Sequence, residues 1–121
     1  MEQREQLQKE VLLELISYSE KLIPGVQILI DELKNGTKED TGEFLNEIIT
    51  GINWEIEVYN QCSALINSKS NYIDKKVMTE AVTHLGQSLS SGDNFLVATC
   101  FEEDFIPFLN KLALAAKMVV E

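Results

Sequence analysis

The sequence predicts an all-α protein, an antiparallel four-helix bundle with a kinked first helix. Apolar residues recur every three or four positions through most of the chain, which is the spacing of one face of an α-helix. Three short breaks rich in Gly, Asn, Ser and Asp, at 34–42, 67–71 and 90–94, separate four such stretches. Four amphipathic helices joined by short connections favour this bundle, and we expect residues 1–121 to form a single domain.

The first helix carries an apolar stripe that runs from Leu7 to Leu33 and is interrupted at Pro24, in the tripeptide IPG. Proline removes one backbone donor and clashes with the preceding turn of a helix. Because the stripe continues on the same face after Pro24, we expect a kink there and not a break.

The other three helices follow from the same spacing. Apolar residues mark a second helix over 45–66 and a third over 73–89, for which Asn71 is the expected N-cap. A fourth helix is predicted over 95–119, with Asp93 as its N-cap. No stretch shows the period-two alternation of a β-strand.

The charge balance limits the classes of partner. The chain has 20 acidic against 10 basic residues, a net charge of −10. Nucleic acids and anionic membranes are polyanions, which most faces of such a protein would repel. We therefore expect no nucleic-acid or membrane partner, whereas the charge balance leaves open a basic protein, or an apolar one with a basic rim.

The N-terminal stretch MEQREQLQKE is charged and lacks the apolar core of a secretory signal. The apolar runs are far shorter than the ~20 residues of a membrane helix. Cys62 and Cys100 have neither C-x-x-C spacing nor a histidine pair nearby, so they are interpreted as reduced core thiols. These observations favour a cytoplasmic protein without a metal or other cofactor.

The stretch LSSGDNFLVATCFEEDFIPFLNKL places two unusual residues in the fourth helix. On a helical wheel Glu102 lies among Ala98, Phe105 and other apolar positions, so it is expected to face the core or its edge. A buried carboxylate must be hydrogen-bonded, paired or protonated. Pro107 cannot donate to the carbonyl of Glu103. We interpret both as structural, with Glu102 tied to a lysine, a tyrosine or a helix end; an acid in a functional pocket is the alternative.

This stretch resembles a motif of an uncharacterised family of small bacterial helical proteins. Its pattern is Gly-Asp, an apolar run with an acid, an acid-x-acid element, two residues and a proline. GINW at 51–54 is similar to a second element of that family, and Thr99 departs from the first, where an aspartate is expected. The resemblance implies a helical bundle with an accessory role and no assigned activity. The matching positions are Gly92, Asp93, Glu102, Asp104 and Pro107.

Trp54 lies nearly opposite the core stripe of the second helix, with Val58 and Leu65 on the same side. Exposed aromatic clusters often mark interfaces, so these three residues are the predicted partner-binding surface. A helix central enough to bury both faces, or a first helix packed over Trp54, are the alternatives. The acids expected to form a negative rim are Glu47, Glu55 and Glu57.

These observations favour a non-catalytic adaptor or chaperone-like bundle that binds another protein or a second copy of itself. The alternative function is histidine phosphotransfer through His84, which has small neighbours at Gly86 and Ser88. The lysine expected two residues after the histidine is missing, and the acidic surroundings repel phosphate. A di-metal carboxylate site ranks third, because the chain has one histidine and Glu80 precedes it by four residues where a metal motif needs three.

Overall fold

A computed structural model describes residues 2–68 and 73–121 of the chain. Within these ranges there are helices and no strands, which confirms the predicted all-α bundle. The elements are α1 (Glu2–Asn35), α2 (Thr41–Ile66), α3 (Lys75–Ser91), α4 (Asn94–Cys100), a π-helical turn η1 (Phe101–Phe105) and α5 (Ile106–Val120).

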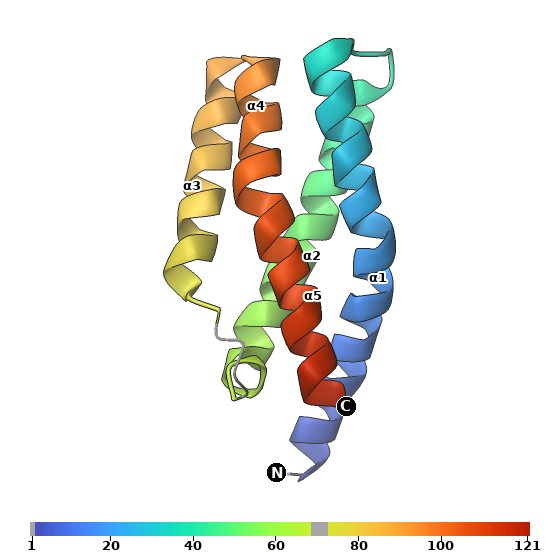
Figure 1. Ribbon diagram of the computed structural model, residues 1–121, viewed down its shortest axis with the longest axis vertical. Helices are drawn as coiled ribbons and strands as arrows, with labels where there is room; N and C mark the ends of the chain where they lie inside the picture. Colours follow the sequence, from blue (N-terminus) through green and yellow to red (C-terminus); the bar gives the residue numbers. More distant parts are fainter. Residues whose placement is uncertain (1, 69–72) are drawn as a thin grey trace.

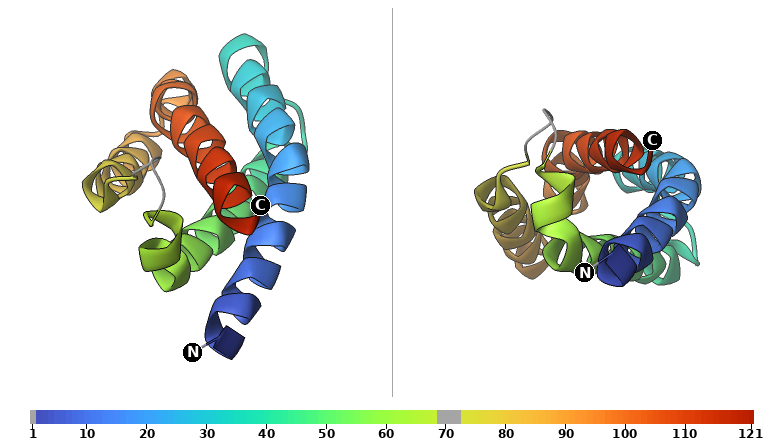
Figure 2. Two further views of the ribbon diagram at one scale, coloured as in Figure 1. Left: turned by 60° about the horizontal axis from the view of Figure 1, so that its bottom comes forward. Right: turned by 90° about the horizontal axis from the view of Figure 1, so that it is seen from below.

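Four rods make up the bundle, because α4, η1 and α5 follow one another without interruption and form a single long helix. In Figure 1 consecutive rods run in alternating directions along the long axis. Helix α1 packs mainly on α5 and α2, whereas α3 packs on α4 and η1 at the far side of the bundle from α1 (Figures 1 and 2). Within the described ranges, no helix is both long and apolar enough to cross a membrane.

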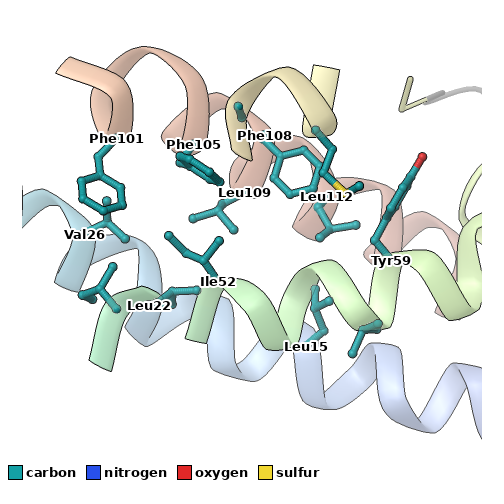
Figure 3. Packing of buried hydrophobic residues seen from close by; sticks show 14 of the residues in the cluster. Leu15, Leu22, Val26, Ile52, Tyr59, Phe101, Phe105, Phe108, Leu109 and Leu112 are labelled. Atoms are coloured by element: carbon teal, nitrogen blue, oxygen red, sulfur yellow. The ribbon is translucent and has the colours of Figure 1, made fainter. Parts of the chain in front are cut away.

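Helix α1 continues through Pro24 as one helix, so the proline does not break it. Apolar side chains of α1, α2 and the last rod meet in one core (Figure 3). Cys62 and Cys100 are both buried and free, in agreement with the prediction of core thiols. The largest fully buried apolar side chains include Tyr59, Phe101, Phe105, Leu12, Leu15, Leu29, Ile52, Leu109 and Leu112.

The turn between α3 and α4 shows why Gly and Asp follow each other in the sequence. Gly92 ends α3 with φ of 72°, a left-handed conformation that glycine adopts without steric cost. Asp93 then begins α4 by accepting hydrogen bonds from the backbone N–H groups of Phe95 and Leu96 at 2.9 and 3.3 Å. The prediction of Asp93 as an N-cap is confirmed.

The start of α3 is held by α2. Asp74 is its N-cap and accepts from the N–H of Lys76, whereas the predicted cap Asn71 lies outside the described residues. Just before α3, the carbonyl of Ile73 accepts from the Tyr59 hydroxyl at 2.9 Å, and its N–H donates to the Asn67 side chain. Helix α3 is therefore fixed at its beginning and along one buried face, which consists of Met78, Ala81 and Leu85.

Candidate functional site

The fourth rod contains a π turn directly before Pro107. The N–H of Ile106 donates to the carbonyl of Phe101, five residues back. Pro107 then stands in the first turn of α5, where a missing N–H is tolerated. The wider turn thus accommodates the proline without ending the rod. Single π turns inside α-helices are rare and frequently occur at functional sites.

Glu102 lies within the π turn, between Ala98 and Phe105, which are both fully buried. Glu102 is half exposed, with a side-chain exposure of 53%, and its carboxylate lies 3.0 Å from the ammonium of Lys34. Of the two placements expected for Glu102, the core is therefore wrong, and a position at the edge of the core agrees with a half-exposed side chain. The expected pairing of Glu102 with a lysine is observed, and Lys34 also lies over the Phe95 ring.

Asp104 brings together two residues that the sequence treated separately. Its Oδ2 lies 3.1 Å from Nδ1 of His84 on α3 and accepts from the Cys100 thiol at 3.5 Å. Burial, and then the hydrogen bond and charge of Asp104, raise the pKa of Cys100 to about 12. Cys100 is therefore a protonated thiol at neutral pH, which is the unreactive form.

The His84–Asp104 pair lies in a cleft of about 430 Å³ between α3 and the η1–α5 part of the last rod. Its base is apolar, and the walls carry charged side chains of both signs with an excess of acids. The apolar lining consists of Ile73, Val77, Pro107 and Phe108, and the polar lining of Asp74, Glu80, His84, Glu103, Asp104 and Lys111.

A second hollow of about 480 Å³ lies between α1 and α2, lined by Glu14, Tyr18, Thr50, Gly51 and Trp54. We call this hollow the aromatic groove. The rings of Tyr18 and Trp54 meet edge to face, with centroids 5.6 Å apart. Tyr18 fits there because position 51 has no side chain: a β-carbon would overlap the Tyr18 hydroxyl and lie 3.1 Å from Cδ1 of Leu22. Two residues of the GINW element, Gly51 and Trp54, thus form the surface on which Tyr18 packs.

The three predicted partner-binding residues differ in exposure. Trp54 and Leu65 are half-buried, but Val58 is only 3% exposed and belongs to the core. The expectation that Val58 contributes to an accessible surface is therefore wrong. Helix α1 covers part of this face of α2, through Tyr18 and a hydrogen bond from Gln8 to the carbonyl of Gln61.

Glu55 does not belong to an acidic rim, because its side chain is fully buried between the helices. Its Oε2 accepts from the Ser19 hydroxyl at 2.8 Å, and its Oε1 has no partner among the described residues. Burial raises the pKa of Glu55 to about 7, an effect that the Ser19 hydrogen bond partly offsets. Glu47 and Glu57 remain exposed.

A family model described as a domain of unknown function (DUF8042) matches residues 10–115. The chain belongs to this family. The match agrees with the predicted membership of an uncharacterised helical family. Neither a curated protein nor a solved structure matches the chain.

In this DUF8042 domain the motif residues of the fourth helix have distinct local roles. Gly92 and Asp93 form the turn before α4, Glu102 pairs with Lys34, and Pro107 follows the π turn. Asp104 and Pro107 both line the cleft beside α3, and Asp104 contacts His84 of α3 there. The motif therefore shapes the rod and also places one acid at an accessible site.

The chemistry available in the domain is limited. Within residues 2–68 and 73–121, no three His, Cys, Asp or Glu side chains gather in a way that could hold a metal ion. The His84 imidazole is 54% exposed, but Glu80, Glu103 and Asp104 share its cleft. Such negative surroundings oppose a phosphoryl group, so the structure does not favour phosphotransfer.

Sequence reasoning offered a first helix packed over Trp54 as an alternative but did not single out Tyr18. It also missed Glu80 and Glu103 as acids of one cleft. Tyr18 lies on the apolar stripe of α1, so its spacing indicates a core residue and not a groove wall. Glu80 and Glu103 have no signal of their own, because exposed acids are common in a chain with this charge. Only the packing of α3 against η1 places them in one cleft.

Proposed function

We propose that this DUF8042 domain is a non-catalytic protein-binding bundle, an adaptor or chaperone-like protein, which seats part of a partner in the aromatic groove. The observation that carries the proposal is the open Tyr18–Trp54 pair above Gly51. Tyr18 is 37% exposed although it packs on Trp54. Aromatic side chains in shallow pockets commonly supply much of the binding energy of an interface.

The surface around the groove extends this binding face. Leu7, which is 62% exposed, lines a neighbouring hollow on the same α1–α2 seam together with Val11. Glu14 lines the groove itself, and Glu47 and Glu57 are exposed on α2. An apolar strip with acidic neighbours favours a partner segment that has apolar side chains flanked by lysine or arginine.

A non-catalytic role is supported by the state of the reactive groups. Burial raises the pKa of the Cys62 thiol, and burial together with Asp104 raises that of Cys100, so neither is a thiolate nucleophile at neutral pH. Glu55 has the raised pKa of a general acid, but its side chain is sealed from solvent. A substrate would have no access to it.

The test is affinity capture from a lysate of the source cells with three tagged proteins: wild type, Trp54→Asp and Val82→Asp. Val82 is a matched control, because it is an exposed apolar residue (45%) on α3, away from the groove. We expect a specific protein to be captured by wild type and by Val82→Asp, and lost with Trp54→Asp. Circular dichroism establishes that each variant is folded, and Leu7→Asp is a second variant on the same α1–α2 seam, in the neighbouring hollow, with a more exposed side chain.

The captured protein can then be tested directly, because Trp54 is the only tryptophan of the chain. Addition of a tryptophan-free fragment of the partner should shift Trp54 emission to shorter wavelength as the ring loses water. Sedimentation at rising concentration tests whether the occupant is a second copy. A partner retained by folded Trp54→Asp and Leu7→Asp proteins would contradict the proposal.

A further inference from the structure

The cleft between α3 and η1–α5 is an elongated groove. On one wall, the stretch from Asp74, the N-cap of α3, to His84 covers ten helical steps and spans about 15 Å at the rise of an α-helix. On the other wall, Glu103 to Lys111 spans about 12 Å. Two helix surfaces of this length, side by side, resemble the grooves in which proteins bind an amphipathic helix.

The groove offers unpaired negative charge on both walls. Asp104 is engaged by His84, and Asp74 caps α3. Glu80 on α3 and Glu103 on η1 are exposed, and neither forms an ion pair within the described part of the chain.

The base of the groove leaves apolar surface open to water. Val77 is 53% exposed although it lies next to the buried side chains of Ile73 and Phe108. Pro107, also exposed, continues this surface on the other wall. An exposed apolar strip bordered by charged side chains is typical of a binding groove.

We propose that this groove is a second docking site of the domain, and that its occupant is a basic amphipathic helix of a partner protein. Its apolar side chains would contact Val77 and Pro107, and its lysine or arginine side chains would meet Glu80 and Glu103. The site lies on the α3 side of the bundle, away from the aromatic groove between α1 and α2 (Figure 2). With both sites filled, the domain would connect two proteins.

The charge and the shape of the groove distinguish this occupant from others. An acidic segment would face unpaired Glu80 and Glu103 as well as the net charge of −10 of the chain. A small organic cation could neutralise one acid but would not span walls of about 12 to 15 Å. A helix places side chains at i, i+3, i+4 and i+7 along that length.

The probe is a fluorescein-labelled helical peptide of about 18 residues, with leucines on one face and lysines on the other. A peptide with the same leucines and with glutamates in place of lysines is its control. Binding is followed by fluorescence anisotropy. The charge variant is Glu80→Lys with Glu103→Lys, and its control is Glu5→Lys with Glu39→Lys, two exposed acids outside the cleft that change the net charge equally.

We expect the lysine peptide to bind wild type, and the Glu80→Lys, Glu103→Lys protein to bind it about tenfold more weakly. The control pair should change the affinity much less. Val77→Asp should also weaken binding, and this result is informative because an added negative charge would by itself attract the peptide. Trp54→Asp, which leaves this groove intact, should still bind the peptide.

Several results would overturn the inference. They are an equal loss in both charge-reversed proteins, an unchanged affinity in Val77→Asp, equal binding of the glutamate peptide, and no binding of the lysine peptide to wild type. Loss of binding in Trp54→Asp alone would place the peptide in the aromatic groove, which would overturn the second site and leave the proposed function standing.

Discussion

Two acids lie where helices of this domain pack together, and they differ in solvent exposure and in the number of their hydrogen-bond partners. Asp104 in η1 is 31% exposed at its side chain and has partners in His84 and Cys100. Glu55 in α2 is fully buried and has one partner, Ser19, for one of its two oxygens. The same functional group is thus accessible in one region and sealed in the other.

The difference follows from how the helices pack. Glu55 lies under α1, which has extensive contacts with both α2 and α5. Asp104 lies beside α3, which is held along one face and at its beginning. Under α1, the burial of an acid affects the stability of the fold. Beside α3, acids remain accessible to a binding partner.

The largest effect expected from this comparison is a dependence of stability on pH through Glu55. Burial raises its pKa from 4.5 to about 7, so the folded protein keeps a proton that the unfolded chain loses above pH 4.5. The free energy of unfolding should therefore fall as the pH rises from 4.5 to 7 and then level off. A shift of this size corresponds to about 3 kcal/mol.

Glu55→Gln isolates this effect, because glutamine keeps the shape of the protonated acid and does not titrate. Urea unfolding of the variant should lack the decrease between pH 4.5 and 7 and should show higher stability than wild type above that range. Glu57→Gln, an exposed acid two residues away, is the control and should follow wild type. Parallel curves for wild type and Glu55→Gln would show that Glu55 is ionised in the folded protein.

A smaller effect is expected at Gly51, on the tightly packed side. In Gly51→Ala the new methyl group would overlap the Tyr18 hydroxyl, and such overpacking costs about 1 to 3 kcal/mol. At Gly86, within α3, a β-carbon would point into open space with no neighbouring side chain within 4 Å, so Gly86→Ala should stabilise the protein by up to about 1 kcal/mol. Thermal unfolding should show a lower melting temperature for Gly51→Ala and a higher one for Gly86→Ala than for wild type.

Tyr18→Phe provides the check on this interpretation, because it removes the overlapping hydroxyl. Gly51→Ala should destabilise the Tyr18→Phe protein less than it destabilises wild type. Equal losses in the two backgrounds would show that Tyr18 is not the neighbour that position 51 accommodates.

The fold could be predicted from the sequence because its determinants are local. Apolar spacing marked the helices, and Asp93 marked the start of the last rod. The failures have equally local causes. A helical wheel does not separate a core position from one at the edge of the core, so it left both open for Glu102, whose side chain is half exposed. Val58 was expected at a surface because a wheel drawn from one helix does not show where the neighbouring helices pack on it.

The candidate sites could be predicted only in part. Trp54 was found because a lone aromatic residue opposite a core stripe is unusual. His84 and Asp104 were each noted, but their contact depends on how α3 and η1 pack, and their separation of 20 residues carries no information about that. Glu55 was expected in the acidic rim because it follows Trp54 in the sequence, whereas the structure buries it against Ser19 of α1.

On the accessible side, Asp104 should control the reactivity of Cys100. Its hydrogen bond and charge raise the pKa of the thiol beyond the effect of burial, so Asp104→Asn should lower that pKa and speed alkylation at alkaline pH. Iodoacetamide labelling followed by mass spectrometry measures the rate at each cysteine. Cys62, whose pKa is raised by burial alone, is the internal control and should react at the same rate in both proteins.

The smallest effect on the free energy of unfolding is expected at Glu102, an exposed acid that can be compared directly with the buried Glu55. Its ion pair with Lys34 is solvent-exposed, and pairs of this kind contribute at most about 1 kcal/mol and weaken with salt. Urea unfolding of Glu102→Gln and Lys34→Met, separately and combined, at low and high salt, measures the coupling. Lys34 also lies over Phe95, so Lys34→Met should cost more than Glu102→Gln. A salt-independent loss of stability well above 1 kcal/mol in Glu102→Gln would show that this acid is buried, as Glu55 is. The last rod would then carry a buried acid as well as the accessible Asp104, and the comparison between a buried and an accessible region would fail.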